Sequence, residues 1–174
     1  AFARGLCVVE DGVVACGSSP STIALHRLEG DAKPRMATLT HDLRNAIANN
    51  ELSIHFQPQA RIDGEIFGFE ALLRWRHPVR GDVPPSTFIP LAEENGLIIP
   101  LSEWVLRQVC REAASWPRSL GVAVNLSPVQ FQHSDLPAVV HAALLESGLS
   151  PGRLELEITE GVLIGDFQRA LAVL

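Results

Sequence analysis

The chain has 174 residues, of which 47% are hydrophobic, and it carries a formal net charge of −6 at pH 7. This length and apolar content predict one folded domain with a modest core and exclude a disordered chain. The acidic balance argues against a nucleic-acid duplex as a partner, because a duplex requires a basic face. A small anionic ligand stays compatible with it, since a bound metal can supply local positive charge.

The cysteines and the hydropathy pattern indicate the cellular compartment in which the chain is found. Cys7, Cys16 and Cys110 are odd in number and far apart, which favours reduced thiols over disulfides. A zinc site that combines the first two with His26 has no recognised spacing. No apolar run approaches the roughly eighteen residues of a membrane span, and the N-terminus shows no secretory signal. We therefore expect a cytoplasmic segment without membrane contact, from a parent that could itself be membrane-anchored.

Residues 1–38 differ in character from the rest of the chain. Short β-prone runs flank a Glu-Asp-Gly turn at 10–12, which predicts a hairpin, and 30–35 has the composition of a linker. We expect an upstream segment or linker of unassigned function over 1–38 and a regular domain over 39–174.

The elements expected in the second region alternate between helix and strand. Helices are predicted over 40–49, 86–95, 102–116, 128–147 and 161–174, and strands over 52–59, 66–73, 120–126 and 154–159. Pro100 is expected to separate the second and third helices. The short connection at Asp63-Gly64 permits only an antiparallel pair between the first two strands. After that hairpin, the order of strands and helices predicts a parallel sheet with right-handed crossovers.

Three apolar strands each carry a metal-competent oxygen near one end. Glu70 is expected where a strand meets a loop, and Asn125 and Glu157 occupy corresponding places in two later strands. Ligands gather at the carboxyl ends of strands in such sheets, so these three side chains can converge. Oxygen donors without a Cys or His partner favour a hard cation such as Mg²⁺ or Mn²⁺. Gln57 is harder to place at this rim, because its strand runs in the reverse direction.

Each candidate also has an ordinary structural explanation. Glu70 and Glu157 could be exposed strand acids, and Asn125 could be a turn residue before a helix. Glu160 could be an acid at a helix start, and Arg74 could pair with a surface acid. The occurrence of all these residues together, in this order along the chain, is what favours a metal-binding site. No Ser-His-Asp arrangement and no glycine-rich phosphate loop is present, so any hydrolysis should be metal-assisted.

Short motifs occur in a characteristic order along the second region. They are Leu-Arg-Asn-Ala-Ile at 43–47, Phe-Gln-Pro at 56–58, Glu-Ala-Leu-Leu-Arg-Trp at 70–75, Phe-Ile-Pro-Leu-Ala-Glu-Glu at 88–94, Asn-Leu-Ser at 125–127 and Glu-Ile-Thr-Glu at 157–160. Together they resemble the N-terminal half of an EAL domain, the bacterial phosphodiesterase domain that hydrolyses cyclic di-GMP. The resemblance implies an α/β fold, a TIM-like (β/α) barrel with its first strand antiparallel, of which this chain would supply about half.

The resemblance also implies roles for individual residues. It assigns the metal to Glu70, Asn125 and Glu157. It assigns contacts with the dinucleotide to Gln57, Leu72 and Arg74, with the arginine near a phosphate, and support of an active-site loop to Glu160. The implied reaction is attack of metal-activated water on one phosphodiester, which yields linear pGpG with Mg²⁺ or Mn²⁺ as cofactor. The implied partners are cyclic di-GMP, a second copy of the chain and an upstream sensor domain.

The family's later segments, including an Asp-Asp pair and a lysine, do not occur before Leu174. A closed barrel usually needs about 250 residues, and half a barrel would expose strand edges. We therefore expect either a part of a longer chain or completion by another copy, and no hydrolysis by this segment alone. The alternatives are a truncated, non-catalytic module that binds cyclic di-GMP or a protein, and an α/β barrel enzyme that acts on another phosphodiester or on a sugar phosphate.

Overall fold

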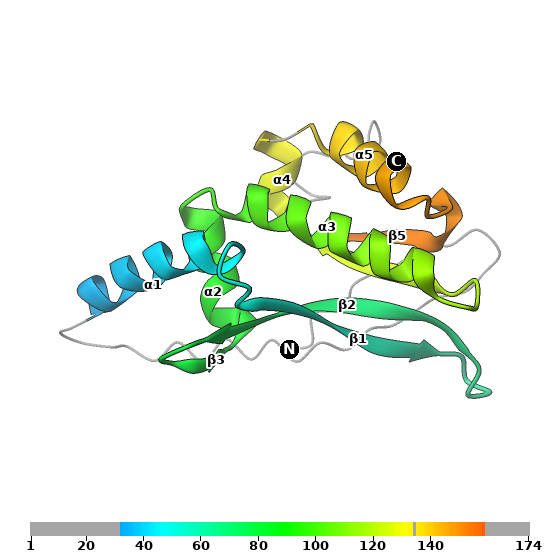
Figure 1. Cartoon of the computed structure of the whole chain (residues 1–174), viewed down its shortest axis with the longest axis horizontal. Coiled ribbons are helices and arrows are strands. Elements are labelled where there is room, and N and C mark those ends of the chain that lie inside the picture. The colour runs from blue at the N-terminus through cyan, green and yellow to red at the C-terminus, as the bar shows by residue number, and fades with distance from the viewer. Residues whose placement is uncertain (1–31, 134, 159–174) are drawn as a thin grey trace.

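The computed structural model describes residues 32–133 and 135–158 of the chain. In these ranges a mixed sheet is covered on one face by long helices, as Figure 1 shows. The helices are α1 (Ala32–Ala46), α2 (Pro85–Glu94), α3 (Ile98–Ser115), α4 (Pro128–His133) and α5 (Leu136–Ser147), with a 3₁₀ turn at Pro151–Arg153. The strands are β1 (Leu52–Ala60), β2 (Ile66–His77), β3 (Gly81–Val83), β4 (Gly121–Leu126) and β5 (Leu154–Ile158).

The described strands pair in the order β1-β2-β4-β5, and β3 pairs with the far end of β2. β1 and β2 are antiparallel, whereas β2–β4 and β4–β5 are parallel. The turn between β1 and β2 is closed by a backbone hydrogen bond from Arg61 to Glu65 (2.9 Å), and Gly64 provides the positive φ of 87° that it needs. The structure thus confirms the predicted hairpin followed by parallel strands.

Alternate residues of each strand point to opposite faces of the sheet, so the sheet has two different surfaces. The helix-covered face packs against α3 and α5 and forms the larger hydrophobic core. Its strand residues include Ile54, Phe56, Ala71, Leu73, Val122, Val124, Leu126, Leu154 and Leu156. The opposite surface, here called the polar face, carries His55, Gln57, Gln59, Glu70, Leu72, Arg74, Asn125, Glu155 and Glu157.

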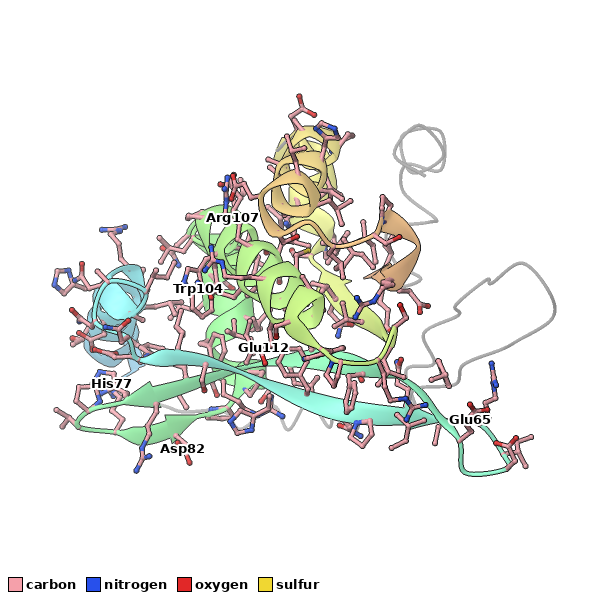
Figure 2. All side chains as sticks on the ribbon, turned by 45° about the vertical axis from the view of Figure 1, so that its right-hand side comes forward. Glu65, His77, Asp82, Trp104, Arg107 and Glu112 are labelled. Carbon is pink, nitrogen blue, oxygen red and sulfur yellow. The ribbon has the colours of Figure 1, made fainter. Side chains whose placement is uncertain are left out.

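A second core joins α1 and α2 to the far end of β2. Trp75 lies at its centre, where it packs edge-on against Phe88 of α2, and its Nε1 donates to Glu51 Oε2 at 3.0 Å. His77, labelled in Figure 2, connects the same end of β2 to α1 through a 3.0 Å contact between its Nε2 and Asp42 Oδ2. The strand that carries Glu70 is therefore anchored at one end by buried aromatic packing.

Two boundaries differ from the sequence expectations. β2 continues to His77 instead of ending at Leu73, so Glu70 lies inside the strand and not where a strand meets a loop. Pairing with β1, and with β3 over Gly81–Val83, holds this extra length. Helix α1 begins at Ala32, so the residues from 32 onward are helical where a linker was expected.

Two helix predictions also need correction. Pro100 does not separate two helices but lies in the first turn of α3, where a residue needs no backbone N–H for the helix ladder. The single helix expected over 128–147 is two helices, because Asp135 caps α5 by accepting a hydrogen bond from Ala138 N (3.3 Å). Gly148 ends α5 in the left-handed conformation. The hairpin around 10–12 and the helix over 161–174 lie outside the described residues.

Candidate active site

Glu70 and Asn125 come together on the polar face although they are 55 positions apart in the chain. Glu70 is the register partner of Ala123 in the parallel β2–β4 pair, which places the next same-face residue of β4, Asn125, beside it. Asn125 Nδ2 donates a hydrogen bond to Glu70 Oε1 at 2.8 Å. The structure therefore brings together the first two of the three residues predicted to hold a metal.

Glu157 joins this pair from the neighbouring strand. It is the register partner of Asn125 in the parallel β4–β5 pair, so the two side chains share the polar face. The pKa of Glu157 is raised to about 6, first by burial and then by the nearby carboxylates of Glu70 and Glu155, while a hydrogen bond from Gln59 opposes the shift. Three side chains that are distant in sequence thus share one negatively charged patch.

The donor set of this patch suits a hard cation. Two carboxylates and one amide supply oxygen atoms, and the donation from Asn125 Nδ2 leaves its Oδ1 as the amide's acceptor. Within the ranges that the structure covers, no three His, Cys, Asp or Glu side chains form a metal-binding group, so Asn125 would have to serve as the third ligand. Mg²⁺ commonly keeps several waters and binds substrate phosphates besides one or two carboxylates, so this incomplete set fits such an ion. Burial, followed by repulsion from Glu70 and Glu155, raises the pKa of Glu157, and a divalent cation would relieve that repulsion.

The three residues expected to contact the dinucleotide lie on the same face. Gln57 is the register partner of Glu70, so the reversed direction of β1 does not carry it away from the site. Leu72 and Arg74 follow Glu70 at alternate positions of β2, and Arg74 is half-buried, with Nη1 donating to the carbonyl of Leu73 at 3.0 Å. Glu160, expected to support a loop, lies outside the described residues.

Two polar-face residues were not predicted as part of the site. Gln59 reaches Glu157 from β1, and Glu155 adds a carboxylate whose own pKa is raised by burial. Gly68 makes room for Gln59, since a Cβ at this glycine would lie 3.4 Å from Gln59 Oε1 and 3.0 Å from the carbonyl oxygen of Gly121. The signal in the sequence was the alternation of β1, which puts Gln59 on the same face as Gln57.

A groove of about 450 Å³ lies elsewhere, between β1 and α3. Its walls include Ile54 and Phe56 of the helix-covered face, together with Trp104 and Glu112 of α3, which Figure 2 labels. The groove is therefore on the opposite side of the sheet from Glu70, and it contains none of the predicted site residues. The predicted site residues therefore lie on the polar face and not in this groove.

Among the described helices, none has both the length and the apolar character needed to cross a bilayer.

Residues 40–174 match the family described as the EAL domain. The chain belongs to the EAL domain family. It is 60% identical over 134 residues to an uncharacterized signaling protein of Caulobacter vibrioides, a match that covers 76% of this chain and 17% of that protein. It is 43% identical over 141 residues to the bifunctional diguanylate cyclase/cyclic di-GMP phosphodiesterase MucR of Pseudomonas aeruginosa, covering 78% of this chain and 21% of that protein.

The solved structures include the phosphodiesterase MucR in complex with c-di-GMP, which superposes with a TM-score of 0.76 at 42% sequence identity. That match covers 79% of this EAL chain and 57% of the solved chain. The likeness confirms the expected α/β fold with a mixed sheet, and it identifies the sheet as part of an EAL barrel. The chain spans only 17% and 21% of the lengths of these two curated relatives.

Proposed function

We propose that this chain provides one part of a cyclic di-GMP phosphodiesterase site, in which Glu70, Asn125 and Glu157 bind Mg²⁺ or Mn²⁺. The observation that carries the proposal is the 2.8 Å hydrogen bond from Asn125 to Glu70, with Glu157 beside Asn125 in the β4–β5 register. Relatives that share the family are cyclic di-GMP phosphodiesterases by name, which supports the same substrate here.

A bound divalent cation would supply water of lowered pKa and would neutralise phosphoryl oxygens, so that hydrolysis opens the ring to linear pGpG. The chain's own residues prepare the site for this chemistry. Asn125 orients the carboxylate of Glu70, and Gln59 orients that of Glu157. Arg74 offers its guanidinium to a phosphate from the same face of β2, and a planar guanidinium can hold two phosphate oxygens at once.

Further features of the proposal concern residues and partners beyond the described ranges. Glu160 would support a loop at the rim of the site, and the rest of the barrel would complete the metal ligands. We place the protein in the cytoplasm, acting with an upstream sensor domain or as a homodimer, as part of bacterial second-messenger signalling.

The test is a calorimetric titration of cyclic di-GMP into the native-length protein, with Mg²⁺ and with EDTA, followed by chromatography of the products. We expect binding in Mg²⁺ and conversion to pGpG, with turnover lost in EDTA. Binding without any turnover in Mg²⁺ or Mn²⁺ would favour a non-catalytic receptor. Turnover of a different phosphodiester, with none of cyclic di-GMP, would refute the proposed substrate.

A further inference from the structure

We propose that Glu93 is a positioning residue for Asn125, acting through Ser127. Glu93 lies in α2, and Ser127 follows Asn125 by two residues at the end of β4. Ser127 Oγ donates a hydrogen bond to Glu93 Oε1 at 2.7 Å. This bond connects the strand end that carries Asn125 to a helix from a distant part of the chain. The inference rests on the proposed function in one respect, namely that Asn125 is a metal ligand.

The hydrogen bonds of Ser127 leave it little freedom. The side chain is 8% exposed, and its Oγ accepts from Val129 N at 3.2 Å while donating to Glu93. The backbone N–H of Ser127 donates to Oε1 of Gln130 at 3.1 Å, and Gln130 is itself 2% exposed. These hydrogen bonds cap the N-terminus of α4. The turn after Asn125 is thus held in one conformation by buried polar contacts.

Glu93 can act as a fixed point because α2 is firmly packed. Phe88, Leu91 and Ala92 of this helix are buried in the core around Trp75. The carboxylate is half-buried, and a hydrogen bond to an ionised acceptor is stronger than one between neutral groups. The hydroxyl proton of Ser127 therefore has one strongly preferred direction.

The consequence for Asn125 follows from its position. On one side its amide donates to Glu70, and across the sheet its backbone pairs with β5 opposite Glu157. Immediately after it the chain enters the turn that Ser127 and Glu93 hold. Removing the Glu93 carboxylate would leave a buried hydroxyl without its acceptor and would loosen this turn. The amide of Asn125 would then sample orientations that do not serve a cation between Glu70 and Glu157.

The variants test whether Glu93 acts as a hydrogen-bond acceptor or through its negative charge. Glu93→Gln keeps an oxygen that can accept from Ser127, whereas Glu93→Ala and Ser127→Ala remove the bond. Asp135→Ala is the matched control, because it removes the N-terminal cap of α5, a similar loss of stability at a residue that takes no part in the hydrogen bonds of Ser127. Asn125→Ala serves as the reference for loss of a ligand.

Two measurements on the native-length protein give the answer. Mn²⁺ affinity is measured from the spectrum of the free ion by electron paramagnetic resonance, without substrate. Amide hydrogen exchange over residues 127–130 is measured in metal-free buffer. We expect Glu93→Ala and Ser127→Ala each to weaken Mn²⁺ binding about 10-fold, the lower end for groups that orient metal ligands, and the double variant to be no weaker. Exchange should accelerate in the same variants. Glu93→Gln, which keeps a weaker neutral acceptor, should lose clearly less than Glu93→Ala in both measurements, and Asp135→Ala should behave like the wild type in both.

Wild-type Mn²⁺ affinity in Glu93→Ala would overturn the inference. So would equal losses in Glu93→Gln and Glu93→Ala, since they would mean that the charge acts directly on the cation. If Asn125→Ala binds Mn²⁺ like the wild type, the proposed metal site fails. In that case the exchange data still decide whether Glu93 holds the turn, so the two failures remain distinguishable.

Discussion

The two faces of the sheet are made by the same strands and differ in almost everything else. On the helix-covered face, Val122, Val124 and Leu126 of β4 are each no more than 4% exposed and pack against α3 and α5. On the polar face the same strand presents Asn125, which is exposed and bonded to Glu70. Buried core residues and the proposed metal ligand therefore alternate along one strand. We therefore expect that a single substitution can alter either the stability or the turnover with little effect on the other.

The largest expected effect is on the polar face. Glu70→Ala removes a proposed metal ligand and the acceptor of the Asn125 hydrogen bond, so kcat for cyclic di-GMP should fall at least about 10²–10³-fold. The melting temperature should change little, because the side chain is only half-buried. Initial rates and thermal unfolding of the native-length protein measure both. Wild-type turnover by this variant would remove the metal assignment.

Val124 of β4, the neighbour of Asn125 in the chain, should show the reverse: a loss of stability without a loss of turnover. Val124→Ala deletes two buried methyl groups from the helix-covered face and should lower the free energy of unfolding by about 2 kcal/mol. Its kcat, measured well below the melting temperature, should match the wild type. Urea unfolding gives the stability change. A large loss of turnover in a fully folded Val124→Ala protein would show that the two faces are not independent.

A smaller effect is expected for Arg74. Arg74→Ala should raise KM for cyclic di-GMP about 10-fold while changing kcat less, because it removes a charged contact that binds substrate. Arg80→Ala, which removes an exposed arginine from the turn after β2, is the matched control and should leave KM unchanged. Equal effects of the two substitutions would mean that Arg74 acts only through general charge.

The smallest expected effect is a gain in stability, caused by replacing Glu157. The pKa of Glu157 is raised from 4.5 to about 6, so the folded protein binds more protons than the unfolded chain between these values. Metal-free wild-type stability should therefore fall as pH rises through that window. Glu157→Gln should be more stable above it, by at most about 1 kcal/mol once solvent screening of a half-exposed group is allowed for. The difference should vanish below pH 4.5.

Thermal unfolding in EDTA at pH 5 and pH 7.5 measures this difference, with the exposed Glu94→Gln as control. The same Glu157→Gln protein should lose the stabilisation that Mg²⁺ gives the wild type. A variant that is less stable than the wild type at pH 7.5 without metal would contradict the raised pKa of Glu157.

The alternation of the two faces was readable from the sequence, whereas the distances between strands were not. Leu154 and Leu156 alternate with Glu155 and Glu157, which predicts one buried and one polar side from β5 alone. The convergence of Glu70 with Asn125 depends on the register between strands, and local spacing does not contain that register. The family resemblance supplied it.

The absence of contacts between distant segments from the local sequence pattern also explains the predictions that were wrong or missing. The end of β2 was missed because its last residues are held by pairing with β1 and β3, which are contacts with other segments. Gln59 was missed because its role depends on reaching Glu157 across the sheet. The break before α5 was the exception, since Asp135 followed by Pro137 is a local signal for a helix start.

The antiparallel start of the sheet has a consequence for how the protein is made. β1 and β2 are joined by a short turn and can pair within microseconds once both have left the ribosome. The amide partner of Glu70 emerges only 55 residues later. In the nascent hairpin the carboxylate of Glu70 therefore stays hydrated. It loses water only when β4 pairs with β2 in parallel, which is a slower, non-local event. The half-site is assembled late in folding, after the scaffold that carries its first acid already exists.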